Sequence, residues 1–126
     1  MRWIKVLLLV VAVNGPAMLA APKVDPSLDP AVVNAKTIRV TFENARVRVL
    51  EAVLQPGDKE RLHRHPAYVF YVLSGGKVRN HAADGKTTDS ELAAGDTIYR
   101  DPLTHFAENI GTTTIRVLLV ELKDPA

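Results

Sequence analysis

Apolar and polar residues alternate along most of the chain after residue 36. The segments 37–42 and 46–54 follow this period of two and are rich in β-branched residues, which is typical of β-strands. The same reasoning predicts further strands at 68–73, 77–81, 87–92, 97–99, 104–108 and 113–121, with a polar stretch that ends at His65 before the first of these. No segment after the first 21 residues shows a sustained helical stripe. The pattern predicts an all-β fold of eight or nine short strands, a sandwich or small barrel.

The first 21 residues have a different character. Arg2 and Lys5 precede the apolar run 6–13, a breaker at 14–16 and small residues at 17–21. This is the order of a secretory signal peptide, and the run is far shorter than the roughly 20 residues that span a bilayer. We expect cleavage near Ala20 or Ala21 and a periplasmic or secreted protein with no membrane attachment afterwards. The alternative is a permanent membrane anchor.

Residues 22–35 are rich in proline, with Pro22, Pro26 and Pro30 at even spacing. Proline at this density disfavours both helix and strand pairing, so we expect an extended arm. The folded domain is then expected over 36–123. The arm can also pair between two copies of the chain, which makes a homodimer one of the expected arrangements.

Composition limits the function further. The chain has 126 residues and no cysteine. This length fits one domain, and the absence of cysteine excludes a disulfide scaffold, a thiol nucleophile and a cysteine zinc site. The net charge of +2 comes from Arg2 and Lys5 alone, since 14 basic and 14 acidic residues follow. No basic cluster indicates nucleic-acid binding.

Three histidines are the strongest candidates for chemistry. His63 and His65 are two residues apart, so on a strand both imidazoles project from the same face. Two imidazoles can share a metal ion if a third ligand comes from another strand, and His105 is that candidate. Taken alone, a His-x-His pair occurs often by chance, so its surroundings decide its weight.

The surroundings of these histidines resemble the two sequence motifs of the cupin family, over roughly residues 37–122. The first motif is matched by Gly57, His63, His65 and Gly75 or Gly76. The second motif is matched by Gly95, Pro102, His105 and Asn109, with the proline one position late. The resemblance implies a jelly-roll β-barrel of two antiparallel sheets, with a divalent metal inside it held by His63, His65 and His105.

One ligand of the cupin motif is missing. Spacing places the family's glutamate at Tyr68, Val69 or Phe70, and none of these is acidic. The resemblance therefore implies a three-histidine site for Fe, Mn, Ni, Zn or Cu, similar to cupin dioxygenases that act on thiols. A dioxygenase-like oxidoreductase acting on a small molecule is one hypothesis. The alternatives are a cupin that has lost its metal, a non-catalytic module that binds a small ligand or metal, and a metal-free isomerase.

Several other side chains have two interpretations each. Tyr68 stands near the missing glutamate and is the candidate catalytic proton donor or ligand, or else a core aromatic, as is Tyr71. Arg100 can bind a substrate carboxylate, although a surface charge is the simpler interpretation. Glu108 is three residues from His105 and is expected on the opposite face of the strand. Asn109 is expected to close a turn with Gly111, and His81 to lie at the surface or rim.

Overall fold

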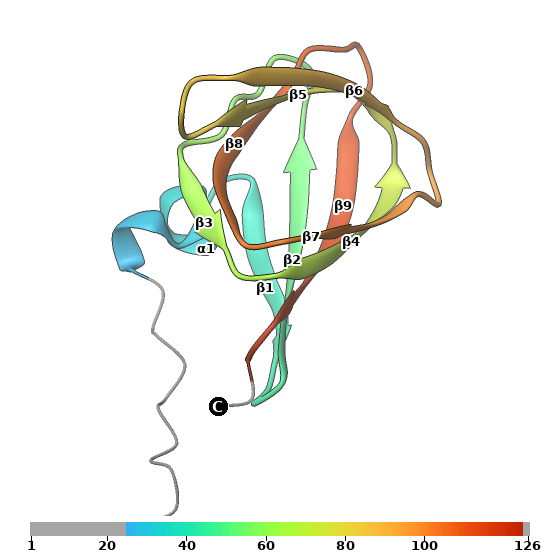
Figure 1. The fold of residues 1–126 in the computed structure, drawn as a ribbon. Coiled ribbons are helices and arrows are strands. Elements are labelled where there is room, and N and C mark those ends of the chain that lie inside the picture. The colour runs from blue at the N-terminus through green and yellow to red at the C-terminus, as the bar shows by residue number, and fades with distance from the viewer. Residues whose placement is uncertain (1–24, 125–126) are drawn as a thin grey trace, which may run out of the picture.

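A computed structural model describes residues 25–124 of the chain. The expected signal peptide lies outside these residues. Within them, nine strands form two antiparallel sheets that face each other and enclose a central space (Figure 1). The strands are β1 (Ile38–Glu43), β2 (Val47–Leu54), β3 (His63–His65), β4 (Tyr68–Ser74), β5 (Gly76–Ala82), β6 (Thr87–Leu92), β7 (Thr97–Arg100), β8 (Leu103–Asn109) and β9 (Ile115–Leu122). The expected all-β jelly-roll barrel is confirmed.

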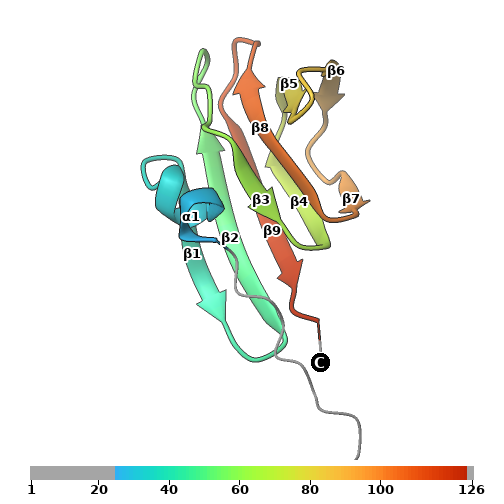
Figure 2. The ribbon, with the colours of Figure 1, turned by 60° about the vertical axis from the view of Figure 1, so that its left-hand side comes forward.

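The order of strands within each sheet brings distant parts of the sequence together. The five-stranded sheet runs β1-β2-β9-β4-β7, and the four-stranded sheet runs β3-β8-β5-β6. Strands β7 and β6 therefore lie at one side of the barrel, each as the last strand of its sheet. Strands β1 and β3 lie at the other side, and the helix α1 (Pro30–Val33) contacts both of them (Figure 2).

Period-two burial explains why the strands pack as they do. In β2 the side chains of Leu50, Ala52 and Leu54 point into the barrel and are almost fully buried. Leu119 of β9 pairs with Leu50 and joins the same core. Burying one such leucine side chain contributes about 1.5–3 kcal/mol, so a one-residue slip of either strand would cost several of these contributions.

The prediction of an extended arm over residues 22–35 is wrong for the second half of that segment. The segment forms a 3₁₀-helix, η1 (Pro26–Leu28), and then the helix α1. Each begins with proline just after an aspartate cap: Asp25 Oδ1 accepts from the backbone N–H of Ser27 at 2.9 Å, and Asp29 Oδ1 from that of Ala31 at 2.9 Å. Proline blocks a helix interior but suits a first helical position, because the N–H it lacks has no partner there. None of the helices in residues 25–124 is long and apolar enough to cross a membrane.

Two glycines of the motif-like blocks occupy turns that favour this residue. Gly57 has φ of +87° and Gly95 has φ of +93°, both in the left-handed region where a Cβ is strained. Gly57 lies in the turn that follows β2 and leads to the segment before His63, and Gly95 lies in the turn before β7. The turns therefore set where the two histidine-bearing blocks enter the barrel.

Candidate metal centre

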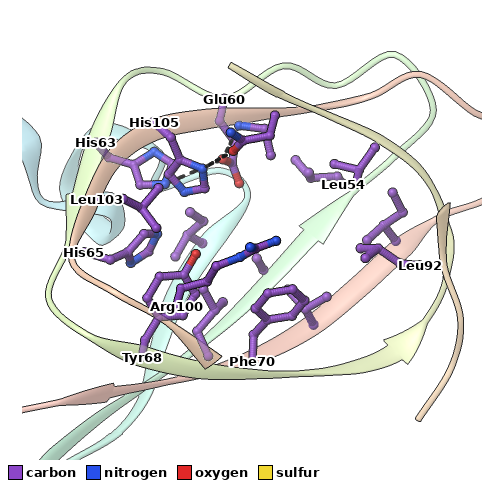
Figure 3. A pocket seen from close by; sticks show the side chains of 18 of the residues that line it. Leu54, Glu60, His63, His65, Tyr68, Phe70, Leu92, Arg100, Leu103 and His105 are labelled. Carbon is purple, nitrogen blue, oxygen red and sulfur yellow. Dashed lines mark hydrogen bonds and ion pairs between the residues drawn. The ribbon is translucent and has the colours of Figure 1, made fainter. Parts of the chain in front are cut away.

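Strands β3 and β8 bring the three expected histidines to one place. His63 pairs directly with His105 across the two strands, and His65 lies two residues farther along on the same face. One ring nitrogen from each imidazole lies within 4.8 Å of the others. His63 and His65 are 1% exposed, and Arg64 between them points out to solvent. The sequence therefore predicted correctly which histidines meet (Figure 3).

Each imidazole is held through its Nδ1 atom by a partner other than the two remaining histidines. His63 Nδ1–H donates to the backbone carbonyl of Arg61 at 2.7 Å. The Asn34 side chain fixes that carbonyl in turn, since its Nδ2 donates to Arg61 O at 3.2 Å and its Oδ1 accepts from Arg61 N at 2.7 Å. With Nδ1 as the donor, Nε2 of His63 carries the lone pair and faces the interior.

His65 is held by a chain of charged groups. Its Nδ1–H donates to Glu121 Oε2 at 2.7 Å, and Arg48 Nε donates to Glu121 Oε1 at 2.7 Å. The Arg48 guanidinium also donates to both carboxylate oxygens of Asp29, at 2.9 and 3.2 Å. Because Asp29 also caps α1, the helical segment before the barrel is joined to the histidine cluster.

His105 completes the set in the same way. Its Nδ1–H donates to the Asn80 side-chain oxygen, which comes from the neighbouring strand β5. All three imidazoles thus bond a supporting partner through Nδ1, which leaves Nε2 of each ring for a ligand. Ligating histidines commonly show this arrangement, in which an outer partner sets the tautomer and the ring orientation.

Burial keeps two of the three imidazoles, those of His63 and His105, neutral. Desolvation, followed by the nearby His65, lowers the pKa of His63 to about 4. Desolvation and the neighbouring His63 and His65 lower the pKa of His105 to about 3. Both rings are therefore uncharged at neutral pH, the form in which an imidazole binds a metal. The donor set and its burial fit a divalent transition metal.

The structure also shows what occupies the place of the missing glutamate. Of the candidate positions, Tyr68 and Phe70 point into the barrel and Val69 points outward. Phe70 gives an apolar wall at the spacing that the motif predicts for the acid. No carboxylate of β4 reaches the histidines.

A different carboxyl group, from Glu60, lies beside the cluster and was missed in the sequence. Glu60 is buried, its Oε2 accepts from the Ala107 backbone N–H at 2.9 Å, and the same atom lies 3.7 Å from His63 Nε2. Desolvation raises its pKa to about 7. Glu60 does not occupy a motif position, so no sequence signal marked it. It is buried because residues 59 and 60 lie alongside β8, with which they form backbone contacts.

The three histidines line a cavity of about 270 Å³ inside the barrel. Its walls are mainly apolar, with Leu54, Phe70 and Leu92 on the side away from the histidines (Figure 3). Thr88 and Ser90 of β6 line the cavity and are exposed. The cavity therefore opens towards solvent along β6.

Tyr68 and Arg100 also line the cavity. Tyr68 is buried, and the centre of its ring lies 4.6 Å from that of His65. Desolvation raises the pKa of its hydroxyl to about 12, so the group is protonated at neutral pH. Arg100 pairs with Tyr68 across β7 and β4, and its guanidinium extends into the cavity rather than away from the protein (Figure 3).

The remaining candidates lie away from the cluster. His81 and Glu108 meet on the outer face of the four-stranded sheet, where His81 Nε2 lies 2.9 Å from Glu108 Oε1. Tyr71 is 44% exposed on the outer face of the other sheet. Asn109 is buried and closes its turn, since its Oδ1 accepts from the Gly111 N–H at 3.0 Å.

Comparison with known proteins agrees with this geometry. No protein-family model matches the sequence, and no curated protein matches it. Among solved structures, the chain is similar to a cupin domain from Bordetella pertussis, with a TM-score of 0.63 and 27% identity over 68% of this chain and 91% of that one. A conserved protein with a double-stranded β-helix domain from Klebsiella pneumoniae gives a TM-score of 0.56 and 28% identity, over 69% and 71% of the two chains.

A third similar structure comes from Thermotoga maritima and is described as a predicted oxalate decarboxylase, with a TM-score of 0.51 and 26% identity over 68% of this chain and 78% of that one. The fold and the three-histidine cluster define a small β-barrel protein with a candidate metal centre in its interior. The chain belongs to the cupin superfamily.

Proposed function

We propose that the protein is a metal-binding cupin whose interior holds a divalent transition metal on His63, His65 and His105. The observation that carries this proposal is the shared support of the three rings, each held through Nδ1 by another residue while one nitrogen of each lies within 4.8 Å of the others. A neutral three-imidazole set suits Fe, Mn, Ni, Zn and Cu alike. When bound, such a metal supplies a Lewis-acid centre with positions left open for a small molecule.

The finer hypothesis is an enzyme that acts on a small molecule in this cavity, in the manner of a dioxygenase. The chain's own contribution is a mainly apolar pocket beside the histidines and a protonated hydroxyl on Tyr68. That hydroxyl can donate a hydrogen bond or a proton to a ligand held at the cluster, which is the role that we propose for Tyr68. The comparison structure described as a predicted oxalate decarboxylase supports small-molecule chemistry in a similar fold.

A specific observation favours a second candidate, a non-catalytic module that binds a small ligand. The inward-facing residues at the position of the motif glutamate, Tyr68 and Phe70, are not carboxylates, so the site lacks the negative ligand that would hold a divalent ion more tightly. A metal-free isomerase using Tyr68 and a neutral histidine as acid and base is a third. Chelation separates the two enzyme candidates, since a metal enzyme loses activity on chelation and a metal-free isomerase keeps it. A non-catalytic module shows no turnover with or without the chelator.

We also propose that the protein is exported to the periplasm or secreted. The support is the order of residues 1–21, in which a basic start, a short apolar run and small residues follow one another. N-terminal sequencing of the protein recovered from the periplasmic fraction tests this proposal. A mature chain beginning near Pro22 supports it, and an intact Met1 in the cytoplasmic fraction contradicts it.

Metal analysis of the purified protein tests the central proposal. We expect about one equivalent of a transition metal in the wild type by mass spectrometry, and its loss in a His63→Ala, His105→Ala double variant. His81→Ala is the matched control, because it removes a histidine from the outer face of the same sheet. Circular dichroism establishes that each variant is folded. No metal in the wild type, and no uptake of added Fe, Mn, Ni, Zn or Cu, would contradict the proposal.

A further inference from the structure

Arg100 is unusual among the arginines of residues 25–124 because its charge is placed in the cavity without a protein partner. It is the last residue of β7 and lies directly opposite Tyr68 on the inner face of the sheet. No hydrogen bond or ion pair joins its guanidinium to another of the described residues (Figure 3). By contrast, Arg48 and Arg79 both donate to carboxylates.

The hydroxyl of Tyr68 is available in the same way. Within residues 25–124 it makes no hydrogen bond, and it points into the cavity on the same side as the Arg100 guanidinium (Figure 3). Two side-chain donors from paired strands therefore face one space with no protein acceptor between them. Arg100 is exposed, and no buried side-chain N or O atom within residues 25–124 lacks a partner, so both donors are reached from the open side of the cavity and can take an acceptor that enters from solvent.

The charge of the cavity also favours an anion. The inward-facing residues at the position of the motif acid, Tyr68 and Phe70, are not carboxylates. Glu60 is the carboxyl group among the lining residues, and its Oε2 already accepts from the Ala107 backbone N–H at 2.9 Å. Arg100 brings a positive charge to the cavity, and a divalent metal on the histidines would add to it.

The size and walls of the cavity restrict the anion further. At about 270 Å³ it corresponds to the volume of about nine water molecules. Apolar side chains of Leu54, Leu92 and Phe70 form the wall beyond the two donors. A fully hydrated inorganic anion would leave this wall uncovered, whereas a short organic acid can place its carboxylate on the donors and its carbon chain against the wall.

We propose that Arg100, together with the Tyr68 hydroxyl, binds the carboxylate of a small organic acid with an apolar body, and that this acid is the ligand class of the cavity. Guanidinium and carboxylate match in a planar two-bond arrangement, and a phenol hydroxyl adds a third donor. The inference deepens the proposed function, since it rests on the cavity beside the three histidines being the site of ligand binding.

Calorimetric titration of the metal-free protein with butanoate and with butanamide tests the inference. The two probes have nearly the same size and differ in charge, so the comparison isolates the carboxylate. We expect butanoate to bind at least about tenfold more tightly than butanamide, as charge-assisted hydrogen bonds imply. Arg100→Gln should reduce butanoate affinity by about tenfold or more and leave butanamide unchanged.

Matched variants keep the result interpretable. Arg64→Gln removes the same charge from the outer face of β3, where Arg64 Nη1 donates to Thr104 at 3.3 Å, and should leave butanoate affinity unchanged. Tyr68→Phe should weaken butanoate by a smaller factor than Arg100→Gln. Arg100→Lys should retain part of the affinity, because lysine keeps the charge but loses the planar pair of donors. The Arg100 side chain has no protein partner, so its variants are expected to fold.

Three results would overturn the inference: no butanoate binding, equal affinity for butanoate and butanamide, or equal losses in Arg64→Gln and Arg100→Gln. Metal content is measured separately on the same preparations. A wild type that binds metal but shows no preference for butanoate leaves the proposed metal centre standing and removes this inference. A wild type that takes up no metal but binds butanoate through Arg100 contradicts the proposed metal centre and leaves this inference standing.

Discussion

Replacing Glu121 with glutamine is the sharpest test of how the outer partners support the candidate metal centre. The carboxylate is 2% exposed and accepts two hydrogen bonds at 2.7 Å, one from His65 Nδ1 and one from Arg48 Nε. Both partners are donors. A glutamine offers a single acceptor oxygen, and its NH₂ group must then face a donor, so one of the two contacts is lost.

The size of the effect follows from these two bonds. Loss of an outer partner of a ligating histidine typically weakens metal binding by about 10–100-fold, which is roughly 1.4–2.7 kcal/mol. A lost hydrogen bond to a charged group also costs about 1.5–3 kcal/mol of folding stability, and it does so with no metal present. We therefore expect Glu121→Gln to lower both the metal affinity and the stability of the metal-free protein.

The assay has two parts and one control. Competition with a chromophoric chelator gives the metal affinity, and urea unfolding of the metal-free protein gives the free energy of unfolding. Glu51→Gln is the matched control, because Glu51 also accepts from two arginines, Arg39 and Arg116, but at the solvent-facing side of β2 and far from the histidines. A Glu121→Gln protein that matches Glu51→Gln in both measurements would refute the reasoning.

Three further predictions follow from the site. The folded-state pKa values of His63 and His105, about 4 and about 3, lie below the ordinary 6.5. Their contribution to the stability of the metal-free protein is therefore fully present above pH 6.5 and is lost as pH falls towards these values. Urea unfolding at several pH values checks this, and a free energy of unfolding that does not change at acid pH would contradict it. Burial raises the pKa of Glu60 from 4.5 to about 7, so the pH dependence has the opposite sign and stability is lost as pH rises through 7. Glu60→Gln should therefore be more stable than wild type by up to about 3 kcal/mol at about pH 8. Equal stability of the two proteins at that pH would show that burial does not disfavour the ionised carboxyl group. Asn34→Ala removes the two side-chain hydrogen bonds to the Arg61 backbone and should destabilise the fold by about 1–3 kcal/mol in the same assay. The variant should also bind metal more weakly, and an unchanged result in the chelator competition would disprove this.

The strands and the three histidines could be predicted because their signals are local. Alternation with a period of two is set by the backbone of each strand, so it survives in the sequence wherever one face is buried. The pairing of His63 with His105 was accessible for a related reason, since each lies in a block whose spacing follows the cupin motifs. The motif spacing placed the missing glutamate at one of three positions, Tyr68, Val69 or Phe70. Only the observed strand register shows that Tyr68 and Phe70 point inward and Val69 outward.

The outer partners could not be predicted because they depend on strand order. Glu121 meets His65 across 56 positions of sequence, and Asn80 meets His105 across 25. A weak signal did exist for Glu121. Glu121 follows Ile115, Val117 and Leu119 at even spacing, so the same alternation places its charge on the inner face, where an acid needs a partner.

The helical segment before β1 is the clearest case of local reasoning that failed for a physical cause. Proline was treated as a barrier to helix formation, which holds for helix interiors, while Pro26 and Pro30 occupy first positions behind aspartate caps. This placement has a consequence for the site. Asp29 holds Arg48, which holds Glu121 against His65, and Asn34 fixes the carbonyl that receives the His63 proton. The residues before the expected domain start at position 36 are therefore part of the support of the centre, because they set which nitrogen of two of its three imidazoles faces the interior.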